Sequence, residues 1–137
     1  MPELPEVETV ARGLNKRIAR DVIESVWLGS KPEPLKSPAA EMAATLESKT
    51  IAGVRRVGKH VVFDLASARN GSAVPHQAQW IVHLGMTGSL RVLSPDAPIK
   101  KHTHAILKLS SGRELRFVDP RRFGRLSVIE KFQAPGS

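Results

Sequence analysis

The sequence contains no cysteine and no long apolar run. Without cysteine the chain can form neither a disulfide nor a thiolate metal site. No apolar run approaches the ~20 residues that a membrane-spanning helix needs, and the first residues lack the pattern of a secretory signal. We therefore expect a cytoplasmic protein that makes no contact with a membrane.

Acidic residues are also scarce, because 13 Asp and Glu stand against 21 Lys and Arg, which gives a net charge of +8. Residues 99–131 carry nine Lys and Arg against three Asp and Glu, and so hold +6 of that charge. The basic residues of this segment are Lys100, Lys101, Lys108, Arg113, Arg116, Arg121, Arg122, Arg125 and Lys131. Such a segment predicts a polyanionic partner, nucleic acid first. The alternative is a basic surface that only keeps the protein soluble.

The 137 residues, 41% of them apolar and 25% charged, suit one globular domain with a core. Apolar residues at helical spacing predict a helix over 3–19. Ser37 as N-cap and Pro38 in the first turn predict a short helix over 38–48. A strand is predicted over 21–28.

From residue 50 onward the pattern is that of β-structure. The predicted strands are 50–57, 59–66, 79–84, 88–93, 104–110, 113–119 and 125–130. Ser111-Gly112 predicts a tight hairpin turn. Residues 67–78, which include Asn70-Gly71 and Pro75, are expected to be a polar, mobile loop. Helices early and strands late predict the α+β class, here an antiparallel β-sandwich (flattened barrel) flanked by an N-terminal helix and one further short helix.

The first residues combine an amine with a carboxyl group. Cleavage of Met1, which a small second residue permits, would leave Pro2 as a secondary amine with a pKa near ~7.7–8.0, so that a useful fraction is neutral. Glu3 beside it completes the pair that Schiff-base chemistry on a sugar or carbonyl carbon requires. The alternative is that Pro2 and Glu3 only begin a helix.

The segment Asp119-Pro120-Arg121-Arg122-Phe123-Gly124 places two arginines and an aromatic residue between apolar strands. Pro120 and Gly124 favour a fixed, protruding turn. Arginine beside an apolar wedge suits insertion into a DNA duplex. The alternative is a hairpin with solvated arginines and with Phe123 in the core.

Met86, between Gly85 and Gly88, is a second candidate for a functional residue, because the glycines allow an unusual backbone path on which it would be an adaptable apolar probe. The alternative for Met86 is a core residue. Lys59 follows Gly58, which would expose it at a bend where it could hold a phosphate. The alternative for Lys59 is a solvated residue at a strand edge.

His102 and His104 stand two residues apart, which on a strand would put both on one face. Such a pair could bind a metal, but no third ligand is evident in the sequence. Donation to a phosphate is the better functional hypothesis for these histidines.

Four motifs, taken together and in this order, resemble one family. They are MPELPEVETV at 1–10, HLGMTGSLR at 83–91, KHTH at 101–104 and DPRRFGRL at 119–126. The chain resembles the formamidopyrimidine-DNA glycosylases, which are bacterial base-excision repair enzymes. Leu4 favours this branch, because the related endonuclease VIII branch usually has glycine there. The resemblance implies a bifunctional DNA glycosylase and AP lyase that acts on double-stranded DNA containing an oxidised purine (8-oxoguanine or a formamidopyrimidine) or an abasic site.

The resemblance also implies catalytic roles. Pro2 would be the nucleophile that attacks C1′ of the damaged nucleotide and forms a Schiff base. Glu3 would be the acid that assists base loss and sugar opening. Lys59 would contact a phosphate and assist β-elimination.

Further roles implied by the resemblance concern DNA binding. Met86, Arg121 and Phe123 would fill the gap that remains when the lesion is flipped out of the duplex. His102, Arg121 and Arg122 would contact phosphates or bases. The location would be the bacterial cytoplasm, at the nucleoid.

The resemblance covers only the N-terminal half of the family pattern. The other half carries a helix–two-turn–helix element and a four-cysteine zinc finger. We therefore expect residues 1–137 to form an isolated N-terminal domain with a missing C-terminal domain as its partner. Zinc would bind only in that absent half, so no cofactor and no metal ligand are expected in this chain. Because its DNA cleft would have one wall, the fragment is expected to be weakly active or inactive.

Two other hypotheses compete with a repair enzyme. The chain would otherwise be a non-catalytic basic β-sandwich module that binds DNA. A third hypothesis is an N-terminal-proline tautomerase, in which the amine acts as a base. Such an enzyme has no need for the 119–124 segment or for a basic cluster.

Overall fold

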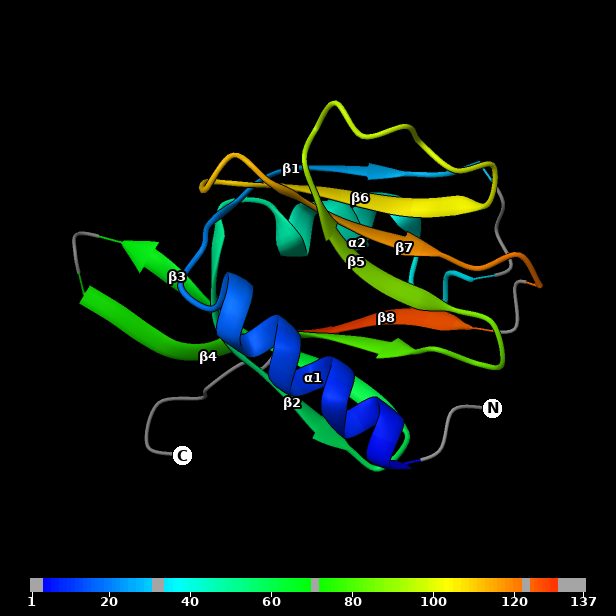
Figure 1. Cartoon of the computed structure of the whole chain (residues 1–137). Coiled ribbons are helices and arrows are strands. Elements are labelled where there is room, and N and C mark those ends of the chain that lie inside the picture. The colour runs from blue at the N-terminus through cyan, green and yellow to red at the C-terminus, as the bar shows by residue number, and fades with distance from the viewer. Residues whose placement is uncertain (1–3, 31–33, 70–71, 122–123, 131–137) are drawn as a thin grey trace.

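The computed structural model describes residues 4–30, 34–69, 72–121 and 124–130 (Figure 1). Two four-stranded antiparallel sheets face each other, with strand orders β1-β6-β7-β5 and β2-β3-β4-β8. The first sheet consists of β1 (Ile23–Leu28), β5 (Ser89–Leu93), β6 (Thr103–Leu109) and β7 (Glu114–Val118). The second consists of β2 (Lys49–Val57), β3 (His60–Arg69), β4 (Ser72–His83) and β8 (Arg125–Glu130). The helices are α1 (Leu4–Ile18) and α2 (Ala39–Leu46), so the predicted α+β class is confirmed.

The predicted amphipathic helix packs against the second sheet. Its apolar stripe, Val7, Ala11, Leu14 and Ile18, is buried at the spacing of one helix face. Figure 1 shows α1 lying along β2, and Asn15 Oδ1 accepts a hydrogen bond of 2.8 Å from the Val54 amide. This side-chain bond satisfies a backbone donor of β2.

The core lies between the two sheets. Phe63 and Trp80 are paired neighbours on β3 and β4, both buried, with ring centroids 4.9 Å apart. A tilted ring pair at this separation is a favourable packing arrangement. None of the described helices is long and apolar enough to cross a membrane.

The prediction of a loop over 67–78 is wrong, because β3 runs to Arg69 and β4 begins at Ser72. Ser67 still pairs with Val74, after a register shift that follows Leu65. Pro75, which suggested a loop, falls where the paired positions skip from Val74 to Ala78, and a bulge tolerates a residue without an amide donor. Asn70 and Gly71 lie outside the described residues.

Two local predictions around turns have different outcomes. Pro38, not Ser37, is the N-cap of α2, and it makes no side-chain cap. The Ser37 hydroxyl instead accepts a hydrogen bond of 3.2 Å from the Val128 amide of β8, so a tertiary contact replaces the cap. The turn at Ser111-Gly112 is confirmed, since Gly112 has a φ of 90° and donates to the Leu109 carbonyl.

Three connections meet at one end of the sandwich: the one between β4 and β5, the segment before β6, and the turn after β7. Figure 1 shows them on the right, the side on which α1 begins. Asp119, in the turn after β7, accepts a hydrogen bond from the β4–β5 connection and donates one to the segment before β6, which confirms that the three lie together.

Candidate nucleic-acid interface

A buried carboxylate, Asp119, holds these connections together. Its Oδ1 accepts a hydrogen bond of 2.6 Å from Thr87 Oγ1, and its Oδ2 accepts one of 2.7 Å from the Gly124 amide. Its own amide donates to the His102 carbonyl at 3.0 Å. Because Asp119 is 0% exposed, these bonds replace the water that an ionised carboxylate would otherwise keep.

The same junction brings together the segments that carry three of the predicted DNA-contacting residues. Met86 precedes Thr87 and is 55% exposed, so the alternative of a core residue is wrong. Arg121 is exposed, and its amide donates to Thr87 Oγ1 at 3.3 Å. His102 is half-buried. Residues 86, 102 and 121, far apart in the sequence, thus lie in three segments that hydrogen bonds of Thr87 and Asp119 join.

Two glycines shape the loop that carries Met86, as the sequence predicts. Gly85 has a φ of 66°, which is the left-handed region that favours glycine. Gly88 donates to the Leu84 carbonyl at 2.9 Å, and a Cβ there would collide with that carbonyl. The tight loop leaves the side chain of Met86 outside the core.

Lys59 lies exposed at the bend between β2 and β3, where Gly58 has a φ of 59°, as predicted. Arg56 fixes this bend, because it donates to the Gly58 carbonyl and to Glu8 Oε1 of α1, each at 3.0 Å. The guanidinium groups of Arg56 and Arg12 hold the pKa of Glu8 below its usual value. Through Arg56, the bend that carries Lys59 is thereby linked to the first half of α1.

Four predicted site residues, Pro2, Glu3, Arg122 and Phe123, lie outside the described residues. Pro2 and Glu3 directly precede α1 in the sequence, and Arg122 and Phe123 lie between Arg121 and Gly124.

The two histidines at 102 and 104 do not form the strand pair considered above. His102 precedes β6, whereas His104 is buried on it, with Nε2 2.9 Å from the Asp119 carbonyl oxygen. In the part of the chain that the structure describes, no three His, Asp or Glu side chains are grouped so that they could hold a metal ion.

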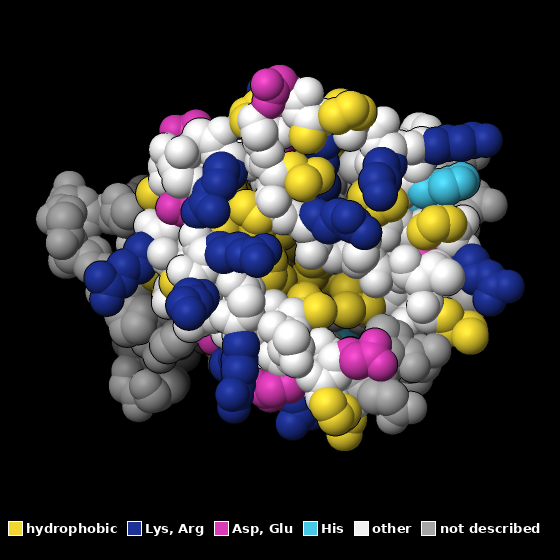
Figure 2. Space-filling view, in the orientation of Figure 1, with side chains coloured by type: hydrophobic (Ala, Val, Ile, Leu, Met, Phe, Trp, Pro, Cys, Tyr) yellow, Lys and Arg dark blue, Asp and Glu magenta, His cyan; other side chains and the backbone are white. Residues whose placement is uncertain are grey.

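The basic segment is less exposed than its composition suggests. Arg116 is 1% exposed and pairs with Glu114 at 2.8 Å, so it is not part of a DNA-binding surface. It also donates to the carbonyls of Ala97 at 3.0 Å and Pro98 at 3.2 Å, and so holds the loop that leads to Lys100. On the face of the molecule drawn in Figure 2, Lys and Arg side chains are more widespread than Asp and Glu.

A basic hollow of about 390 Å³, which no sequence motif indicates, lies between β3, β4 and β8. Lys36, His60, His83 and Arg125 line it together with Ile81 and Ser127. His60 pairs with His83 across the strands, with ring centroids 5.2 Å apart. Burial, and then the charges of His60, Lys59 and Arg125, lower the pKa of His83. Only the strand register reveals this cluster, because residues 60 and 83 are distant in the sequence.

The model of the formamidopyrimidine-DNA glycosylase N-terminal domain matches residues 1–126. The chain belongs to this family. The formamidopyrimidine-DNA glycosylase of Xanthomonas campestris is 45% identical over 126 residues, which is 92% of this chain and 43% of that protein. The enzyme of Shewanella amazonensis is 40% identical over 124 residues, 90% of this chain and 41% of that protein. The chain thus spans less than half the length of the curated relatives it matches.

The solved structures to which this chain is similar include members of the same family. The formamidopyrimidine-DNA glycosylase of Lactococcus lactis, bound to DNA that contains an AP site, superposes with a TM-score of 0.82 at 34% identity, over 94% of this chain and 45% of that chain. Its complex with DNA that contains FAPY-dG gives a TM-score of 0.81 at 34% identity, over 94% and 44%. The family resemblance of the four sequence motifs and the sandwich fold are therefore confirmed.

Proposed function

We propose that this chain provides the nucleophile and part of the DNA-binding surface of a base-excision repair enzyme, a DNA glycosylase and AP lyase for oxidised purines. The observation that supports this most directly is the Asp119 junction, which gathers Met86, His102 and Arg121 at the end of the sandwich where α1 begins. Family membership and the adjacent Pro2-Glu3 pair support the same proposal. The proposed partner is double-stranded DNA that contains an oxidised purine or an abasic site.

The proposed chemistry starts from the amine of Pro2 after removal of Met1. The amine forms a bond to C1′ of the damaged nucleotide as the glycosidic bond breaks, and the departing base takes a proton. Glu3 assists base loss and sugar opening, which yields the Schiff base. β-Elimination then removes a proton from C2′ and breaks the bond between C3′ and its phosphate oxygen, which releases the 3′ phosphate. Lys59 contacts a phosphate and assists this step. If Met1 remained, Pro2 N would be a tertiary amide and no attack would occur.

The remaining residues hold the DNA. We assign Met86, Arg121 and Phe123 to the gap left by the flipped nucleotide, and His102, Arg121 and Arg122 to phosphates or bases. Flipping a nucleotide costs a few kcal/mol, and an inserted wedge offsets part of that cost. The exposure of Met86 supports its part in this assignment.

This chemistry needs an amine and a carboxyl group, so we propose that the chain works without a bound cofactor. A sequence without cysteine offers no thiolate ligand for zinc. The proposed location is the bacterial cytoplasm, at the nucleoid.

Borohydride trapping tests the nucleophile. The 137-residue chain should be trapped on duplex DNA with a preformed abasic site, and Pro2→Gly should reduce trapping, because a primary amine then replaces the secondary amine of proline. Glu3→Gln should reduce it, because the carboxyl group assists sugar opening. Trapping on intact 8-oxoguanine duplex should be much weaker, since the chain spans less than half of its relatives. Intact mass should show that Met1 is absent.

The competing function is a DNA-binding module without catalysis, which the basic face in Figure 2 also supports. In that case duplex binding would persist, no covalent product would be trapped, and Pro2→Gly would change nothing. Absence of trapping on abasic DNA by a protein that lacks Met1 would overturn the proposed nucleophile.

A further inference from the structure

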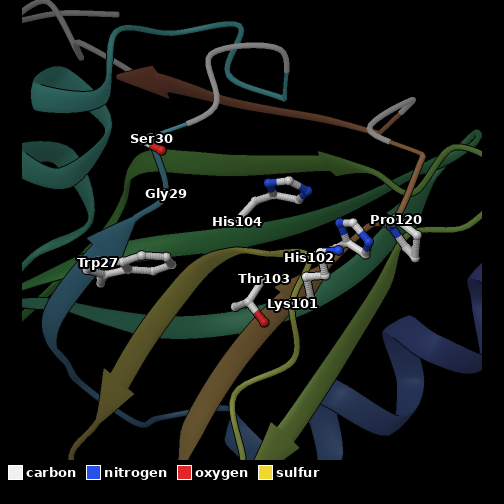
Figure 3. Close-up of a pocket in the computed structure, with 8 residues that line it drawn as sticks. All are labelled: Trp27, Gly29, Ser30, Lys101, His102, Thr103, His104 and Pro120. Atoms are coloured by element: carbon white, nitrogen blue, oxygen red, sulfur yellow. The ribbon is translucent and has the colours of Figure 1, made fainter.

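A cavity of about 400 Å³ opens beside the Asp119 junction, and His102 is the one residue of its lining to which the proposed function gives a role. The residues that line it are Trp27, Gly29, Ser30, Lys101, His102, Thr103, His104 and Pro120. Figure 3 shows Trp27 at one end of this cavity and His102 with Pro120 at the other. Its volume lies within the ~300–1,000 Å³ typical of small-ligand sites.

The aromatic wall of the cavity is the side chain of Trp27. This side chain is 50% exposed, on β1, where its residue pairs with Ile106 of β6. Gly29 lies directly beside the indole, because a Cβ at this position would stand 3.5 Å from Trp27 Cη2, at ordinary van der Waals distance. A half-exposed indole with free space beside it suits the stacking of a planar ring.

The opposite wall is basic. Lys101 is exposed and His102 is half-buried, and none of the described lining residues is acidic. The inner wall is fixed, because His104 is buried with Nε2 held 2.9 Å from the Asp119 carbonyl oxygen. Pro120 connects this wall to Arg121, so the cavity adjoins the surface assigned to DNA.

We propose that this cavity binds one unpaired nucleotide of the DNA, with its base stacked on Trp27 and its phosphate held by Lys101 and His102. The inference rests on the proposed function for the identity of the polymer, and it adds a second contact site beside the inserted loops. Stacking on an aromatic side chain needs a base that is out of the duplex stack. Such stacking is possible for a base of any sequence. The cationic end suits the phosphate on the same nucleotide.

Tryptophan fluorescence tests the site, because the chain has two tryptophans and Trp80 is fully buried. A short single-stranded oligothymidylate, added to the 137-residue chain, should quench the emission of Trp27. Trp27→Leu should remove the quenching and weaken binding about tenfold, which is within the range measured for loss of one base stack. Trp27→Phe keeps an aromatic ring and should retain most of the affinity.

A lysine pair provides the charge control. Lys101→Ala should weaken oligothymidylate binding and reduce its dependence on salt by about one released counterion. Lys16→Ala, an exposed lysine in the last turn of α1, should change neither.

The outcomes separate this inference from the proposed function. If duplex binding persists while oligothymidylate neither quenches Trp27 nor loses affinity in Trp27→Leu, the nucleotide site is refuted and the proposed function stands. Quenching by an acidic peptide alone would also refute it. If the chain binds neither oligothymidylate nor lesion-containing duplex, both proposals are overturned.

Discussion

The side chains of Thr87 and Asp119, 32 residues apart in the sequence, meet in a hydrogen bond of 2.6 Å between Oγ1 and Oδ1. The same hydroxyl accepts the Arg121 amide at 3.3 Å. One threonine therefore couples the loop that exposes Met86 to the loop that exposes Arg121. The relative position of these two side chains depends on a single buried carboxylate.

Replacement of Thr87 by valine should loosen this coupling. Asp119 Oδ1 would lose its hydroxyl donor while the carboxylate stays buried, and we expect a loss of about 1–2 kcal/mol in the free energy of unfolding. Thr87→Ser keeps the hydroxyl and should stay close to the wild type. Urea denaturation measures both, and equal stability of the valine and serine variants would contradict the role of this bond.

Alanine at Gly88 should destabilise the protein by about 1–3 kcal/mol, as overpacked cores do. Its Cβ would collide with the Leu84 carbonyl and lie 3.1 Å from Phe117 Cε1. Gly13→Ala is the matched control, because nothing lies within 4 Å of a Cβ there and the residue is inside α1. It should stabilise the protein by about 0.5–1 kcal/mol. Thermal unfolding of both variants should show a lower melting temperature for Gly88→Ala and a higher one for Gly13→Ala.

Arg116→Met should cost about 3–5 kcal/mol, because it leaves Glu114 buried without its cation. The pair has side chains only 1% and 7% exposed. The double variant Arg116→Met/Glu114→Gln removes both charges and should be more stable than the single variant. Chemical denaturation of the two proteins decides this, and a double variant that is less stable would show that the pair does not act as a unit.

His83, whose pKa is lowered by burial and then by the charges of its neighbours, makes stability depend on pH. The pKa of His83 is lowered in the folded protein, so the unfolded chain takes up this proton more readily. The resulting loss of folding stability is absent well above the ordinary histidine pKa of ~6.5. It grows as the pH falls through that value toward the lower pKa of the folded protein. His83→Gln should therefore lose less stability than the wild type between neutral and mildly acidic pH, as measured by urea denaturation at each pH.

Lys59→Ala should weaken duplex binding under the proposed function and reduce the slope of log affinity against log salt by about 0.9. Lys59 is exposed at the β2–β3 bend, which Arg56 ties to Glu8 of α1. Lys16→Ala again serves as the control, since it removes the same charge from the last turn of α1. Fluorescence anisotropy with labelled duplex gives both slopes, and identical slopes would exclude a phosphate contact at Lys59.

Local pattern was enough to predict most of the fold. The apolar spacing from Val7 to Ile18 predicts α1, because a helix repeats every 3.6 residues and one face must be buried. The positions of the strands follow from the same kind of periodicity, and the four motifs indicate the family. The error at 67–78 arose because a proline ordinarily ends a strand, whereas a shift in register accommodates it here.

Long-range pairing decided what those motifs do together. The sequence singles out Pro2, Glu3, Lys59, Met86 and Arg121 by residue type, by their immediate neighbours and by the four motifs in which they stand. Three features depend on which strands are neighbours. Asp119 joins residues 87, 102 and 124, Arg116 is internal, and Trp27 faces His102 across a cavity. Strand order and register bring distant residues within hydrogen-bonding distance, and no local pattern in the sequence specifies them.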